Sequence, residues 1–205
     1  MSWMARLFGT GTRAGLPALA LLAVLAGCSR QSAPAPRFMG TDVTGAPYGR
    51  DFHLTDYNGK ARSLADFKGK AVVMFFGYTH CPDVCPTTLS DLAQAMKRLG
   101  KDAERVQVLF VTVDPERDTR DVLARYVPAF YPSFLGLYGS PRATAATARE
   151  FHVFYRKHYE AGSDDYSVDH SAASYVFDPS GRLRLLWNYG IGVDAMVHDV
   201  KLLLG

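Results

Sequence analysis

Two cysteines, Cys81 and Cys85, are the residues whose type and spacing most clearly indicate chemistry in this chain. They follow an apolar run at 71–76, which predicts a buried strand, and precede an amphipathic stretch at 87–99, which predicts a helix. The pair therefore lies on a strand-to-helix turn, at the positive end of a helix dipole, where we expect the thiolate form to be stabilised. A thiolate is both the nucleophile of disulfide chemistry and a soft metal ligand.

The spacing of the two cysteines permits either chemistry. A disulfide can form between residues four apart at a helix start, because their Cα atoms lie near the usual separation of about 5.5 Å. The intervening segment is one residue longer than in a Cys-x-x-Cys pair, which spreads the sulfurs enough to chelate a single ion. Pro82 and Pro86 stiffen the turn in both cases. Thiol redox chemistry and metal binding therefore remain open.

A metal site built on two thiolates needs a further ligand, and an imidazole would complete a Cys₂His set that suits copper or zinc. The candidate is His170, which ends a polar, mobile loop expected at 159–169 and precedes a strand expected at 174–178. In a thioredoxin-like layout this junction faces the cysteine turn, and Asp169 is a candidate hydrogen-bond acceptor that orients the ring. His80, next to the first cysteine, is expected to point away from the site.

The remaining patterns predict an α/β fold with a mixed central sheet. Apolar runs bounded by turn residues predict two hairpins and a second buried strand, and capping residues predict where the helices begin and end. The expected elements are a hairpin at 52–64 around an Asn-Gly turn, a strand at 106–113, a helix at 119–127 capped by Asp118 and stopped by Pro128, a helix at 140–151, a hairpin at 174–187, and a helix at 193–204.

A charged segment at 114–119 follows the second buried strand. It lies on the side of the sheet where ligands bind in α/β proteins. The segment has two interpretations: a turn with a helix cap, or a charged rim that recognises a partner.

The N-terminus predicts export and lipid attachment. Basic residues without acidic ones precede an apolar stretch at 16–26, which has the length of a signal peptide and is shorter than the roughly 20 residues of a membrane-spanning helix. The run Leu25-Ala26-Gly27-Cys28 resembles the bacterial lipobox, so we expect residues 1–27 to be a lipoprotein signal peptide and Cys28 to carry lipid. An ordinary signal peptide that contains a cysteine is the alternative.

The segment after this cysteine predicts a lipid-anchored tether at 28–45, because its first part is rich in Ser, Ala and Pro. The domain is then expected at 46–205, on the extracytoplasmic (periplasmic) side and attached to the membrane through lipid. That compartment permits disulfides. Three cysteines are present in all, so the lipid site leaves two for the domain.

The net charge of the mature chain does not support nucleic-acid binding. The full chain has 23 basic and 20 acidic residues, and residues 1–27 contain two arginines and no acidic residue. Removal of the leader leaves 21 − 20 = +1. A net charge this close to zero gives no reason to expect binding to a polyanion such as a nucleic acid.

Three segments together resemble the Sco/SenC family: 76–86 with the cysteines, 112–119, and 166–171. The resemblance implies a thioredoxin-like fold, here with an N-terminal hairpin, and a membrane-anchored copper-binding protein that assists the dinuclear copper site of cytochrome c oxidase. It implies that Cys81, Cys85 and His170 bind copper. The implied partners are the copper-bearing oxidase subunit and other periplasmic copper chaperones or thiol reductants.

Two functions from different classes follow. The first is a copper chaperone that delivers copper to the dinuclear oxidase site or matures it, in which case the protein is not an enzyme. The alternative is a thiol–disulfide oxidoreductase, with Cys81 and Cys85 as its redox pair, that keeps the oxidase copper-site cysteines reduced. The two functions differ in whether they need His170. Copper binding needs its imidazole, whereas dithiol reduction passes electrons between sulfurs alone. A peroxidase is a weaker third reading, since it needs no such histidine.

Overall fold

The strands and helices follow the apolar pattern of the chain. The computed structural model describes residues 37–159, 162 and 165–205. Its strands are β1 (Thr41–Asp42), β2 (Leu54–Asp56), β3 (Ala61–Arg62), β4 (Ala71–Gly77), β5 (Val106–Thr112), β6 (Leu135–Tyr138), β7 (Tyr155–Tyr159), β8 (Tyr166–His170), β9 (Ser174–Phe177) and β10 (Leu183–Trp187). Its helices are α1 (Val84–Leu99), α2 (Arg120–Phe130), α3 (Pro141–Glu150) and α4 (Val193–Leu204), with 3₁₀ helices η1 (Leu64–Phe67) and η2 (Gly100–Arg105).

A mixed sheet forms the centre of the fold. Its strand order is β1-β10-β9-β4-β5-β6-β2-β3. Strands β4 and β5 are parallel, with Ala71 opposite Val106 and Gly77 opposite Thr112, whereas β9 pairs antiparallel with β4. Every residue of β4 is buried, as expected for a central strand covered on both faces. The α/β fold with a mixed central sheet and an N-terminal β2–β3 hairpin is therefore confirmed.

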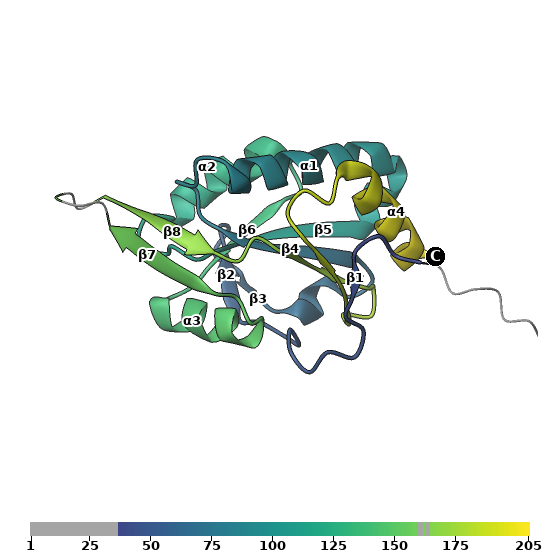
Figure 1. Cartoon of the computed structure of the whole chain (residues 1–205), viewed down its shortest axis with the longest axis horizontal. Helices are drawn as coiled ribbons and strands as arrows, with labels where there is room; N and C mark the ends of the chain where they lie inside the picture. The colour runs from purple at the N-terminus through teal and green to yellow at the C-terminus, as the bar shows by residue number, and fades with distance from the viewer. Residues whose placement is uncertain (1–36, 160–161, 163–164) are drawn as a thin grey trace, which may run out of the picture. The chain divides into compact units, whose positions relative to one another are not determined.

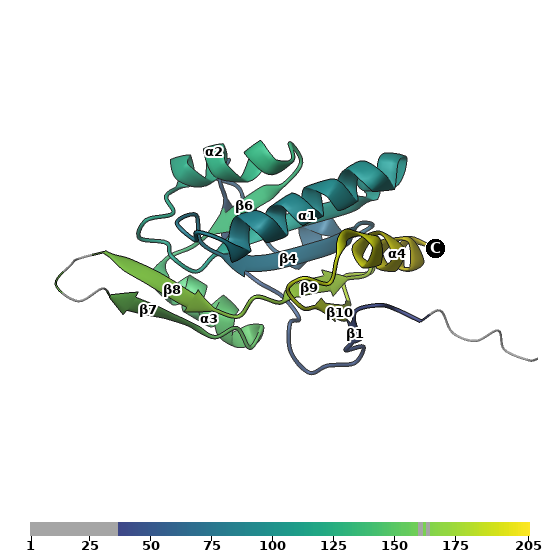
Figure 2. The same ribbon diagram turned by 45° about the horizontal axis from the view of Figure 1, so that its top comes forward.

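Helices cover both faces of this sheet. Helices α1, α2 and α4 lie on one face and α3 on the other (Figure 1), and α1 packs beside α4 (Figure 2). The apolar stripe of α1 explains its packing, because Leu89, Leu92, Ala93 and Met96 recur at helical spacing and are all buried.

The helix after β5 differs from expectation at both ends. Thr119, rather than Asp118, caps α2, since its Oγ1 accepts a hydrogen bond from the backbone N–H of Val122. Pro128 lies inside the helix, which continues to Phe130. A proline so near the end removes one backbone donor from the last turn without stopping it.

The polar segment expected to be a loop at 159–169 is strand at both of its ends, so the expectation is wrong for Tyr159 and for 166–169. Strands β7 and β8 pair antiparallel, with Tyr155 opposite His170 and Tyr159 opposite Tyr166, in a sheet of their own. This two-stranded sheet extends away from the large sheet (Figures 1 and 2). Val168 is its only fully buried residue among those described, so the hairpin has no apolar alternation for a sequence pattern to detect.

The folded unit begins before residue 46, the start expected from sequence. Strand β1 pairs with β10, and the backbone N–H groups of Met39 and Gly40 donate to the buried Asp199 carboxylate of α4. The expected signal peptide at 1–27 and Cys28 lie outside the described residues. Within the described ranges, no helix combines the length and apolar character needed to cross a membrane.

Candidate metal centre

The two cysteines lie at the start of α1, which begins three residues earlier than predicted. Cys85 is in the first helical turn and is fully buried against the core. Cys81 lies in the preceding loop and is only partly buried. The backbone N–H of Cys85 points to Cys81 Sγ at 3.5 Å, and both cysteines are free thiols. One sulfur is therefore shielded while the other is accessible.

A glycine in β4 makes the space for the buried sulfur. A Cβ at Gly77 would lie 2.8 Å from Cys85 Sγ and 2.9 Å from Phe110 Cε2, closer than real Cβ atoms approach. Sequence reasoning missed this residue, although a glycine at the end of an apolar strand, just before two cysteines, signals a close approach.

His170, the last residue of β8, meets the buried sulfur. Its Nε2 lies 3.4 Å from Cys85 Sγ, and its Nδ1 lies 3.0 Å from the backbone carbonyl oxygen of Ser171. Because a carbonyl only accepts, we assign the ring proton to Nδ1. Nε2 is then left with a lone pair that faces the sulfur.

Neighbouring groups hold the imidazole in this orientation. The rings of Tyr78 and Phe75 meet it edge-on, at centroid distances of 5.9 and 6.1 Å. Ser171 is itself held by Phe154, whose carbonyl accepts from the Ser171 N–H and whose N–H donates to the Ser171 hydroxyl. The Ser171 carbonyl, which accepts from Nδ1, is thus held in place by the residue just before β7.

The result is a compact group of three donor atoms. One ligand atom each from Cys81, Cys85 and His170 lie within 4.8 Å of one another. Two sulfurs and an imidazole nitrogen suit copper or zinc, and three protein ligands leave a coordination position open.

Burial disfavours the charged forms of Cys85 and His170. Burial raises the pKa of Cys85 and lowers the pKa of His170. The thiolate expected at the helix start is therefore disfavoured at Cys85, because burial removes its hydration. With the ring proton on Nδ1, the Cys85 thiol can donate to Nε2, and a bound cation would displace that thiol proton.

Asp169 and His80 are exposed and do not belong to the group of three donors. Asp169 is exposed and lies opposite Arg156 in the hairpin, so the Ser171 carbonyl occupies the acceptor position expected for its carboxylate. Asp169 still acts on the ring through space, since its charge favours the protonated imidazole. His80 is mostly exposed and bonds to Thr79, which agrees with its expected position away from the donor set.

The two aspartates of the charged segment after β5 form an internal brace, whereas Glu116 between them is exposed. Asp114 and Asp118 are both fully buried. Asp118 accepts hydrogen bonds from the hydroxyls of Thr79 and Thr112, at 2.6 Å each. Thr79 is two residues before Cys81, so the brace holds the cysteine loop.

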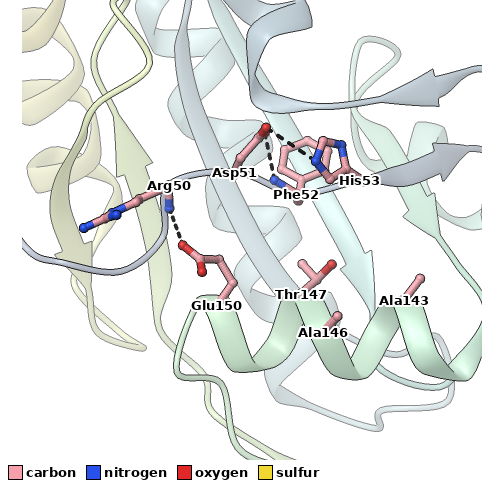
Figure 3. Close-up of a pocket in the computed structure, with 8 residues that line it drawn as sticks. All are labelled: Arg50, Asp51, Phe52, His53, Ala143, Ala146, Thr147 and Glu150. Atoms are coloured by element: carbon pink, nitrogen blue, oxygen red, sulfur yellow. Dashed lines mark hydrogen bonds and ion pairs between the residues drawn. The ribbon is translucent and has the colours of Figure 1, made fainter.

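A groove in the described part of the chain lies away from the three donor atoms. This groove, of about 460 Å³, lies between the segment before β2 and helix α3 (Figure 3). Two of its carboxylates are already paired, because Glu150 accepts from the Arg50 N–H and Asp51 accepts from the Phe52 N–H. None of the three donor residues lines it.

Known proteins are similar to this chain over most of its length. The SCO1/SenC family model matches residues 41–205. A mitochondrial SCO2 homolog of Mus musculus is 46% identical over 153 residues, which are 74% of this chain and 60% of the relative. The chain thus spans roughly half to three-fifths of the curated relatives it matches first, from 48% to 60% of their length.

Two solved structures are similar in fold and sequence. Copper-bound ScoI of Bradyrhizobium japonicum is 40% identical with a TM-score of 0.69, covering 75% of this chain and 98% of that one. Apo Sco1 of Thermus thermophilus is 46% identical with a TM-score of 0.74, covering 84% and 100%. Because the family model covers well over half of its length, this chain belongs to the SCO1/SenC family.

Proposed function

We propose that this protein binds one copper ion through Cys81, Cys85 and His170. The observation that carries the proposal is the grouping of their ligand atoms within 4.8 Å. The soft donor set fits copper, and the lone pair on His170 Nε2 needs no prior loss of a proton. A copper-bound relative at 40% identity supports the choice of metal.

We propose further that the copper is cargo, and that the protein is a chaperone for the dinuclear copper site of cytochrome c oxidase. Cys81 is partly exposed, so a partner's ligand can approach the ion from that side. An open position on a three-ligand ion permits exchange through a shared intermediate. The family resemblance supports the copper-bearing oxidase subunit as the recipient.

The proposed location is the extracytoplasmic face of a membrane, with Cys28 as the lipid-bearing residue. The support comes from the run Leu25-Ala26-Gly27-Cys28 and from the apolar stretch before it. Residues 28–36 would then belong to the tether.

The rival function is a thiol–disulfide oxidoreductase that acts on the oxidase cysteines. It is favoured by one observation: both thiols are free and adjacent, with one accessible to a mixed disulfide. Copper retention needs the imidazole, whereas dithiol reduction needs the sulfurs alone. His170 is therefore the residue that separates the two functions.

The test measures copper binding and oxidase assembly in the same set of variants. Cys81→Ser, Cys85→Ser and His170→Ala should each lower copper affinity by more than about 100-fold, since loss of a ligand exceeds the roughly 10–100-fold of an outer-sphere change. His158→Ala, an exposed histidine on β7, is the matched control and should bind normally.

In a deletion strain, all three site variants should fail to restore assembly of the oxidase copper site. Added copper should restore part of it by mass action. Full rescue by His170→Ala, together with failure of both cysteine variants, would favour the oxidoreductase.

A further inference from the structure

One short turn contacts both halves of the metal centre. Residues 114–118 connect β5 to α2, and the turn is held internally because the Asp118 N–H donates to the Asp114 carbonyl at 2.9 Å. On one side, Asp118 accepts from the backbone N–H and the hydroxyl of Thr79, in the loop that leads to Cys81. On the other side, the same turn reaches the hairpin that ends in His170.

The contact with the hairpin centres on Arg117 and Tyr166. The guanidinium carbon lies 3.6 Å from the centroid of the Tyr166 ring, and Nη1 donates to the Tyr166 carbonyl at 2.8 Å. The Arg117 Nε donates to the buried Asp114 carboxylate at 2.6 Å, and the Tyr166 hydroxyl donates to the other oxygen of that carboxylate at 2.9 Å. The three side chains close a ring of contacts, which we call the clasp.

The clasp also adjoins the imidazole through Tyr78. The Arg117 guanidinium lies 5.8 Å from the centroid of the Tyr78 ring, and that ring meets His170 edge-on at 5.9 Å. Tyr166 is four residues before His170 on the same strand. The clasp therefore acts on the imidazole both along β8 and through the ring that packs against it.

The hairpin needs such a contact because it is not part of the large sheet. Strands β7 and β8 form a separate sheet, so no strand ladder fixes their distance from the cysteines. Val168 is the one buried hairpin side chain among the described residues, and the Lys157–Glu116 ion pair is partly exposed. Exposed ion pairs constrain geometry weakly.

We infer that Arg117 and Tyr166, held by Asp114, are positioning residues that set the distance between the His170 imidazole and the two sulfurs. This inference rests on the proposed function for its effect on copper, and on the contacts above for its effect on the hairpin. Neither residue belongs to the group of three donors. Their action passes through His170, whereas Asp118 in the same turn acts on the cysteine loop.

The test combines variants of the clasp with the loss of the imidazole, using the full chain purified in detergent. Arg117→Ala removes the guanidinium. Arg117→Lys keeps the charge but cannot donate to Asp114 and Tyr166 in one plane, so it should restore binding only in part. Arg156→Ala removes an exposed cation from the same hairpin and is the matched control.

Copper affinity is measured by competition with a chromophoric chelator, in the wild-type and His170→Ala backgrounds. With the imidazole present, Arg117→Ala should weaken binding by about 10–100-fold. In the His170→Ala background the same change should alter affinity by no more than about twofold, because a residue that acts only through His170 has nothing left to position. An equal loss in both backgrounds would overturn the inference.

A second measurement needs no metal. Hydrogen exchange at the amides of β8 should quicken in the metal-free Arg117→Ala chain and stay unchanged in Arg156→Ala. Unchanged exchange together with unchanged affinity would reject the clasp. Normal copper binding by His170→Ala itself would instead reject the proposed ligand set, while faster exchange in Arg117→Ala would still support the structural part of the clasp.

Discussion

Cys85 Sγ lies 3.4 Å from His170 Nε2, although 85 positions separate the two residues in the chain. One residue is in the first turn of α1, and the other is the last residue of β8. Their contact joins a helix of the main body to a hairpin outside the central sheet. The properties expected of the metal centre depend on this contact and on the groups that maintain it.

Gly77→Ala should disturb the buried sulfur. The added methyl group would meet Cys85 Sγ at 2.8 Å, so either the thiol or strand β4 must move. We expect a loss of about 1–3 kcal/mol in the free energy of unfolding, together with weaker copper binding. Gly136→Ala is the matched control, because its Cβ would crowd Val127 and Leu123 instead. Urea unfolding and copper titration of both variants check this, and normal binding by Gly77→Ala would contradict it.

Asp169→Asn should weaken copper binding less than His170→Ala does. The carboxylate acts on the imidazole only through space, because the Ser171 carbonyl accepts the Nδ1 hydrogen bond. We expect a change below the roughly 10–100-fold typical of residues bonded to a ligand. Parallel copper titrations of the two variants measure the difference. Complete loss of binding in a folded Asp169→Asn protein would make Asp169 a ligand.

The stability of the wild type relative to Asp118→Asn should fall as pH rises. Burial raises the pKa of Asp118, while hydrogen bonds from Thr112 and Thr79 oppose the increase. A group whose pKa is higher in the folded protein contributes stability below its unfolded value, and loses it as pH rises through the folded value.

The asparagine side chain does not titrate. Its altered hydrogen bonds change the free energy of unfolding by an amount that does not depend on pH, so they do not affect how the difference between the two proteins varies with pH. Urea unfolding of both proteins between about pH 4 and pH 7 measures this slope, since aspartate ordinarily titrates near pH 3.9. A difference that stays constant with pH, or that grows in favour of the wild type, would show that Asp118 titrates normally.

Asp199→Ala should release the N-terminal segment without changing the metal centre. The buried carboxylate accepts from the N–H groups of Met39 and Gly40 and from Trp187 Nε1. Loss of this acceptor leaves the buried Trp187 Nε1–H without a partner, which should cost about 1–3 kcal/mol.

Limited proteolysis should then cut near residue 39 faster, while copper affinity stays normal. Asp194→Ala removes an exposed carboxylate from the same helix and is the matched control. Cleavage at the wild-type rate in Asp199→Ala would mean that other contacts hold the segment.

Cys28→Ser should abolish lipid attachment. In the proposed anchor, this thiol carries the lipid and cleavage occurs before it. The variant should accumulate as an unprocessed precursor. Cell fractionation measures membrane attachment, and mass measurement of the N-terminus shows whether the precursor has been cleaved. A variant that is still cut before residue 28 and remains on the membrane would reject the lipid assignment.

The sequence by itself determined the central elements and the residue types of the site. The apolar runs of β4 and β5 and the stripe of α1 predicted the core, because their periods follow from strand and helix geometry. The cysteine spacing and the family resemblance singled out Cys81, Cys85 and His170 as candidate ligands. These are local features, which need no knowledge of distant contacts.

Only the tertiary structure decided how those residues meet. The β7–β8 hairpin has one buried residue among those described, and one of its contacts comes from Arg117, a residue of a different segment. Burial of Asp118 turned an expected helix cap into a brace for the cysteine loop. Burial also raises the pKa of Cys85, whereas the helix dipole predicted a lowered one. Solvent exclusion and contacts between distant segments arise from the packing of the whole chain, so no local pattern encodes them.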